Sequence, residues 1–126
     1  MAVASLDEAL AAWRLLGLAE THREEVPTQK VRVAFLTVGE SAIELLEPTS
    51  SDSPIARFLE KRGPGVHHVC FRVTDIEASI AELEAAGCRL LNRVPAPGAA
   101  GKRVAFLHPD SGKGVLIELA EKGGAP

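Results

Sequence analysis

Apolar positions along the chain recur with two different periods, and these periods predict a helix followed by three strands. Over residues 6–16 apolar side chains return every three or four positions, Ser5 and Glu8 form a capping box in front of them, and Gly17 ends the pattern. This indicates an amphipathic helix. Segment 30–38, rich in Val, Ala, Phe and Leu, then predicts a strand that the turn residues 39–41 join to a second strand as a hairpin, and a third strand is expected just before this pair. The expected strands are 19–24, 30–38 and 42–46.

The second half of the chain shows the same alternation of periods. Ser53 and Pro54 open a short predicted helix that ends at Gly63 and links the two halves. The segment 95–101 is rich in Gly and Pro, so we expect an irregular loop there and a candidate mobile lid. The other expected elements are a strand at 66–73, a helix at about 75–86, a strand near 89–94, and a hairpin of 103–108 with 114–120.

An internal duplication explains this similarity, because residues 65–119 repeat residues 1–45. At an offset of 70, Val3 meets Val73, and the match continues further along the chain. The run RVAFL occurs at both 32–36 and 103–107, and IEL occurs at both 43–45 and 117–119. His68 has no counterpart, since the matching position would precede the first residue. We therefore expect a site built from paired residues of the two modules that lacks one of its four members, the first module's histidine. We also expect that the chain begins at an internal start codon of a longer reading frame.

Length and composition favour one globular domain over residues 1–126, with module 1 at about 1–48, the linker helix at about 53–63 and module 2 at about 65–120. The net charge of −3 and scattered basic residues exclude a nucleic-acid footprint. No apolar run is long enough to cross a membrane and no signal peptide is evident, so we expect a cytoplasmic protein. Cys70 and Cys88 lack metal-type spacing and are interpreted as core thiols.

Three polar side chains stand out among the predicted strands. Side-chain alternation puts Val69, Phe71 and Val73 on the core face of their strand and His68 on the opposite face. By the same alternation, Glu44 and Glu118 point to the face opposite the apolar residues of the duplicated IEL strands. Each alone would be an ordinary surface residue, but the matched positions of the two carboxylates favour a site. An imidazole with carboxylates suits a divalent cation.

Other polar residues have simpler interpretations. By alternation His67 lies on the packed face, where a hydrogen-bonded core histidine is expected, and His22 and His108 need no role. The basic side chains near the two loops are interpreted as solvated charge, with a grip on a phosphorylated substrate as the alternative. These are Lys102, Arg103 and Lys113.

Three stretches of the chain, 24–39, 43–76 and 106–119, resemble the vicinal oxygen chelate superfamily with its glyoxalase fold, and more closely the methylmalonyl-CoA epimerase family. The resemblance implies an α+β fold of two βαβββ modules that form a curved mixed sheet, here with the first strand truncated. It also implies a divalent metal ion (Co, Mn, Ni, Zn or Mg) bound by His68, Glu44 and Glu118, without the family's first-strand histidine. A homodimer and an acyl-CoA substrate are expected as well.

The activity implied by the resemblance is that of a racemase/epimerase, the interconversion of (R)- and (S)-methylmalonyl-CoA through a metal-stabilised enolate. Glu118 and Glu44 are then the expected catalytic residues, one taking the proton and the other returning it. A further glutamate of some members falls near Val33, which cannot move a proton. Two alternatives stay open: a glyoxalase-I-like isomerase (lactoylglutathione lyase) and a non-catalytic binding protein of the same fold.

Overall fold

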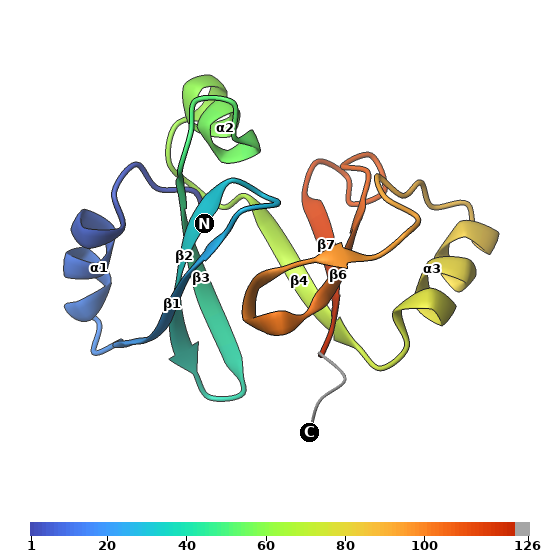
Figure 1. Cartoon of the computed structure of the whole chain (residues 1–126), viewed down its shortest axis with the longest axis horizontal. Helices are drawn as coiled ribbons and strands as arrows, with labels where there is room; N and C mark the ends of the chain where they lie inside the picture. The colour runs from blue at the N-terminus through green and yellow to red at the C-terminus, as the bar shows by residue number, and fades with distance from the viewer. Residues whose placement is uncertain (123–126) are drawn as a thin grey trace. The chain divides into compact units, whose positions relative to one another are not determined.

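The computed structural model describes residues 1–122, and the chain divides into two compact units between His67 and His68. The first unit has the element order helix, three strands, helix, and its strands form an antiparallel sheet in the order β1-β2-β3. Figure 1 shows α1 lying alongside this sheet. The elements are α1 (Leu6–Arg14), β1 (Glu20–Val26), β2 (Val31–Val38), β3 (Ser41–Pro48) and α2 (Pro54–Arg62).

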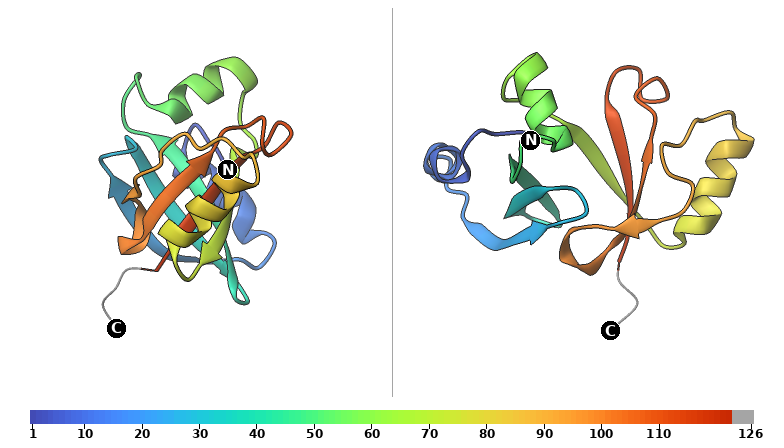
Figure 2. Two further views of the ribbon diagram at one scale, coloured as in Figure 1. Left: turned by 90° about the vertical axis from the view of Figure 1, so that its right-hand side faces the viewer. Right: turned by 45° about the horizontal axis from the view of Figure 1, so that its top comes forward.

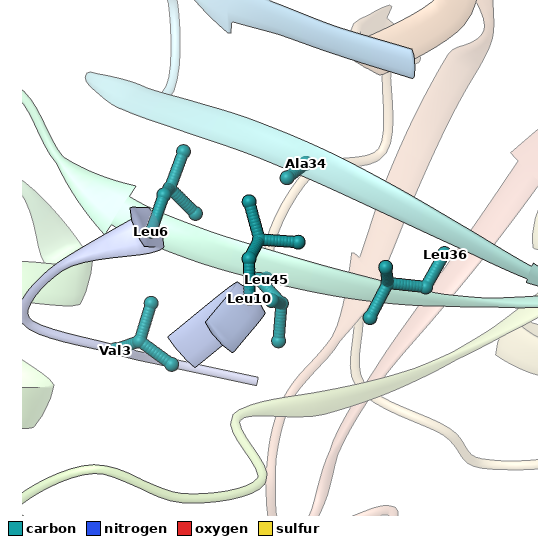
Figure 3. Close-up of a cluster of buried hydrophobic side chains, with 6 residues drawn as sticks. All are labelled: Val3, Leu6, Leu10, Ala34, Leu36 and Leu45. Carbon is teal, nitrogen blue, oxygen red and sulfur yellow. The ribbon is translucent and has the colours of Figure 1, made fainter. Parts of the chain in front are cut away.

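Helix α1 packs its apolar face on strands β2 and β3. Leu6 and Leu10 are at most 2 % exposed and point toward the apolar side chains of the sheet (Figure 3). The helix starts at Leu6 because the Ser5 hydroxyl accepts a hydrogen bond from the Glu8 amide, as the capping box predicts. The cluster consists of Val3, Leu6, Leu10, Ala34, Leu36 and Leu45.

The first residues of the chain lie parallel to β3. Ala2 forms a parallel bridge with Leu46, and the amides of Val3 and Leu46 bond the carbonyls of Leu46 and Met1. In the second unit Arg72 is paired in parallel with Ala120. Since Leu46 and Ala120 each follow an IEL run, residues 1–3 hold the same place beside β3 as residues 71–73 hold beside β7. The offset of 70 is therefore confirmed in the backbone.

The second unit repeats the arrangement with a mixed sheet in the order β4-β7-β6-β5, in which β4 runs parallel to β7. Helix α3 covers one face of this sheet (Figure 2), and its buried Ile76 and Ile80 pack on Ala105, Leu107 and Leu119. The elements are β4 (His68–Val73), α3 (Ile76–Ala85), β5 (Ala96–Pro97), the 3-10 turn η1 (Ala99–Gly101), β6 (Arg103–Leu107) and β7 (Leu116–Glu121).

One ionic contact is duplicated along with the fold. In the first unit Arg32 Nη1 lies 2.6 Å from Glu47 Oε2, and the other Glu47 oxygen accepts from the Leu6 amide at the start of α1. In the second unit the partners are Arg103, Glu121 and the Ile76 amide at the start of α3. Each arginine thus holds a carboxylate that satisfies a helix N-terminal N–H group. We call this the Arg–Glu clamp.

The α+β class and the two-module organisation are confirmed, but some local predictions are wrong. Segment 89–94 is not a strand, since Leu90 alone forms a bridge there, to Leu107. Segment 95–101 is not wholly irregular, because it contains β5 and η1. In β4 the expected core residues Val69 and Phe71 are 43 % and 55 % exposed, since α3 covers β6 and β7 and leaves the edge strand open.

The expectation about the cysteines is wrong for one of the two. Cys70 is exposed, because it lies on the edge strand β4, whereas Cys88 is half-buried and packs against the core below α3. Among residues 1–122, no helix has the length and apolarity to cross a membrane.

Candidate metal centre and active site

His68 and Glu118 lie on one face of the second unit's sheet, opposite the face that carries α3. His68 begins β4, and Glu118 in β7 is in parallel register with Cys70, two residues further along β4. Because alternate residues share a face, His68, Cys70 and Glu118 project to the same side. Ile117 and Leu119, the neighbours of Glu118, project to the α3 side and join the core. The predicted orientation of Glu118 is thereby confirmed.

The two side chains are close together and nearly buried. His68 Nε2 lies 4.0 Å from Glu118 Oε2, and the side chains are 8 % and 9 % exposed. An imidazole nitrogen and a carboxylate oxygen each bind a first-row divalent ion at about 2.0–2.2 Å, so two such ligands of one ion are at most about 4.4 Å apart. The separation of 4.0 Å is within this limit. Both the donor types and their spacing therefore fit a metal ion.

Phe106 contacts this pair from β6. Its ring meets the His68 imidazole edge to face, with ring centres 6.2 Å apart and an interplanar angle of 85°. Along the β6–β7 ladder Phe106 is the register partner of Glu118. One aromatic residue thus borders both candidate ligands. Sequence reasoning missed it, although its place in the repeated RVAFL run was a usable signal.

Glu44, the third predicted ligand, belongs to the first unit. It lies in β3 as the register partner of Phe35, the counterpart of Phe106 in the other RVAFL run. It is half-buried, and its neighbour Leu45 faces the α1 core. Glu44 and Glu118 therefore hold equivalent places in the two modules. Val33 is buried and apolar, so no proton-transfer group exists at that position.

The remaining histidines have contacts within their own units. His67 meets Phe58 edge to face at 5.1 Å between ring centres, as suits a packed side chain. His22 pairs with Glu24 and lies against Phe35, and His108 Nδ1 accepts from the Asp110 amide. These contacts give each of them a local structural role.

Three carboxylates form a second acidic group in the second unit, made of Asp75, Glu77 and Glu121, whose oxygens lie within 4.8 Å of one another. Arg103 donates to both Glu77 and Glu121, and these hydrogen bonds are the largest cause that lowers the pKa of each carboxyl. The same contacts raise the pKa of Arg103. Arg103 is thus engaged by carboxylates, which favours structural charge over a grip on a phosphorylated substrate.

Comparisons with known proteins agree with this geometry. A model of the Glyoxalase/Bleomycin resistance protein/Dioxygenase superfamily matches residues 1–106. An ethylmalonyl-CoA/methylmalonyl-CoA epimerase from Cereibacter sphaeroides is 43 % identical over 96 % of this chain and 92 % of its own. The chain therefore belongs to the Glyoxalase/Bleomycin resistance protein/Dioxygenase superfamily, and within it to the family of the methylmalonyl-CoA epimerases.

Solved structures show the same fold. A hypothetical protein from Bacillus halodurans has a TM-score of 0.94 and 46 % identity, covering 98 % of this chain and 91 % of its own. A methylmalonyl-CoA epimerase solved in complex with methylmalonyl-CoA and NH4+ has a TM-score of 0.92 and 35 % identity, over 97 % and 90 % of the two chains. At these identities the likeness extends to the sequence as well as the fold.

Proposed function

We propose that the protein is a racemase/epimerase that interconverts (R)- and (S)-methylmalonyl-CoA. The observation that carries the proposal is the nearly buried His68–Glu118 pair on the face away from α3, in a chain whose relatives are epimerases of this substrate. The reaction requires removal of the hydrogen at C2, between the thioester and the carboxylate, and return of a proton to the opposite face. A carboxylate is a suitable group for such a transfer.

We propose His68, Glu118 and Glu44 as ligands of a divalent metal ion. The 4.0 Å separation of His68 Nε2 and Glu118 Oε2 supports the first two. Support for Glu44 is its equivalence to Glu118 in register and in sequence. When bound, such an ion acts as a Lewis acid that stabilises the negative charge on the enolate oxygen of the substrate. Nitrogen and carboxylate donors together suit Co, Mn, Ni, Zn or Mg.

Glu118 is the proposed catalytic residue that removes the C2 proton, and Glu44 is proposed to act on the other face. The low exposure of Glu118 supports its role, because water is largely excluded from the carboxylate and competes little with a bound substrate. A carboxylate that is tightly coordinated is a poor base. The glutamate that transfers the proton would therefore have to be only weakly held by a bound ion.

The alternatives left open by the sequence receive no support from the relatives. A glyoxalase-I-like isomerase would use similar ligands, and a binding protein could share the fold, but the epimerases among the similar proteins favour neither. Within the proposal the acyl-CoA is the substrate and the protein acts as a homodimer. A single domain over residues 1–126 and a cytoplasmic location stay predictions from the sequence.

One experiment separates the three functions. The purified protein is loaded with Co²⁺ and incubated in D2O with (S)-methylmalonyl-CoA, and deuterium at C2 is followed by mass spectrometry while bound metal is measured. We expect metal-dependent deuterium incorporation that chelation abolishes. Bound metal with no exchange at C2, together with turnover of a glutathione hemithioacetal, would support the isomerase instead. A protein that binds no metal and catalyses neither reaction would be a binding protein.

A further inference from the structure

Asn92 takes the place of a backbone ladder along the outer edge of β6. Its side-chain Oδ1 accepts a hydrogen bond from the Phe106 amide at 2.8 Å. Its Nδ2 donates to the carbonyls of Val104 at 3.2 Å and Val94 at 3.0 Å. A single side chain thus satisfies an N–H and a C=O of β6 at the point where segment 89–94 leaves the strand path. Such groups are costly when left without a partner in a folded protein.

The duplication shows what Asn92 replaces. At the offset of 70 its counterpart is His22, which is paired through the backbone with Phe35 in the β1–β2 ladder. Two residues earlier in each module, Glu20 pairs with Leu36, and its counterpart Leu90 forms the bridge to Leu107. The two modules are thus in the same register up to this point. Beyond it the first continues as a strand, and the second depends on Asn92.

Phe106 is the residue that this arrangement holds in place. Both of its main-chain polar groups point to the outer segment, the N–H to Asn92 and the C=O to the Leu91 amide at 2.7 Å. Its pairing with Glu118 on the other side is therefore a non-hydrogen-bonded pair, in which facing side chains approach more closely. Its ring then packs edge to face on the His68 imidazole.

We propose that Asn92 is a positioning residue that fixes Phe106 and, through the Phe106 ring, the orientation of the His68 imidazole. The inference rests on the proposed function only for its consequence, which is tighter binding of a metal ion by a pre-oriented imidazole. Substitution of a group that contacts and orients a metal-binding histidine typically lowers metal affinity by about 10–100-fold. Asn92 does not contact His68 itself but acts through Phe106, so the lower end of this range is expected.

The test compares Asn92→Ala with a matched control, Arg103→Gln. Both changes weaken contacts of strand β6, but Arg103 contacts Glu77 and Glu121 and leaves Phe106 and His68 untouched. The chemical shifts of the His68 ring protons, which sense the Phe106 ring, are measured by NMR in metal-free protein. Binding of Co²⁺ is measured by calorimetry, and the melting temperature of each variant is recorded alongside. Asn92→Ser is measured in the same way as a milder variant if Asn92→Ala does not fold.

We expect Asn92→Ala to move the His68 ring shifts and to weaken Co²⁺ binding about tenfold. Arg103→Gln should leave the His68 ring shifts and the Co²⁺ affinity within error of the parent, even if it lowers the melting temperature as much as Asn92→Ala does. Unchanged His68 shifts in Asn92→Ala, or equal changes in the control, would overturn the inference. If the parent itself binds no Co²⁺, the proposed metal site fails, and the ring shifts in metal-free protein still decide the role of Asn92.

Discussion

His68 Nε2 lies 4.0 Å from Glu118 Oε2, and both side chains project from strands that are hydrogen-bonded to each other in parallel register. The spacing of these two atoms, the proposed metal ligands, is therefore determined by the β4–β7 ladder, not by a loop. The polar face that carries the pair is separate from the apolar face that packs on α3. Because of this separation, the chemistry of the site and the stability of the unit can be changed independently by substitution.

Glu118→Gln should abolish exchange of the C2 hydrogen while the protein stays folded. The amide has nearly the same volume as the carboxylate but cannot accept the substrate proton, and loss of a general base typically lowers the rate about 10²–10⁴-fold. Deuterium incorporation into methylmalonyl-CoA measures the rate, and circular dichroism checks the fold. Exchange within a few-fold of the parent would show that Glu118 is not the base.

His68→Ala should weaken metal binding much more than it weakens the metal-free fold. The imidazole is nearly buried but lies outside the apolar cluster below α3, so its removal leaves no void in that core. Calorimetric titration with Co²⁺ should show at least a tenfold loss of affinity. The melting temperature without metal should fall by only a few degrees. A large drop would instead mark His68 as a core residue, and Ile80→Ala provides the comparison for such a drop.

Much of the fold could be predicted because the same sequence pattern occurs in both modules. The RVAFL and IEL runs place Glu44 and Glu118 opposite Phe35 and Phe106, and the structure has both pairs in register. Side-chain alternation was enough to place both glutamates on the face opposite the core. Capping also followed from local chemistry, since the Ser5 and Ser53 side chains accept from helix amides as their positions indicate.

The wrong predictions concern segments whose structure depends on a particular side-chain contact or on the position of the strand in the sheet, and not on the local sequence pattern. Segment 89–94 has strand-like composition, but Asn92 satisfies β6 with its side-chain amide, so no regular ladder forms. Val69 and Phe71 alternate correctly but lie on an edge strand that α3 does not cover. The Arg–Glu clamps join residues up to 45 positions apart, and no local pattern reveals such partners.

Acid should selectively weaken the Arg–Glu clamp of the second unit. The pKa values of Glu77 and Glu121 are lowered in the folded protein, chiefly by hydrogen bonds from Arg103. Their contribution to stability is therefore fully present above the unfolded pKa and is lost as the pH falls through the lowered folded pKa. Urea unfolding at several values between pH 7 and about pH 3 should show parent and Arg103→Gln converging as the pH falls. A difference between the two proteins that stays constant over this pH range would contradict a titrating clamp.

The same Leu→Ala substitution should destabilise the first unit strongly at a buried position below α1 and only slightly at an exposed one. Leu45 of β3 is fully buried in the cluster that contains Leu6 and Leu10 of α1, whereas Leu16 beyond the end of α1 is 70 % exposed. Leu45→Ala removes the same atoms as Leu16→Ala but also leaves a cavity, so we expect a loss of about 2–5 kcal/mol in the free energy of unfolding. The change for Leu16→Ala should stay within about 0.5 kcal/mol. Urea unfolding monitored by the fluorescence of Trp13, which packs against the same cluster, measures both. Equal losses in the two variants would mean that Leu16 is also covered in solution, and that the exposed end of α1 is a contact surface.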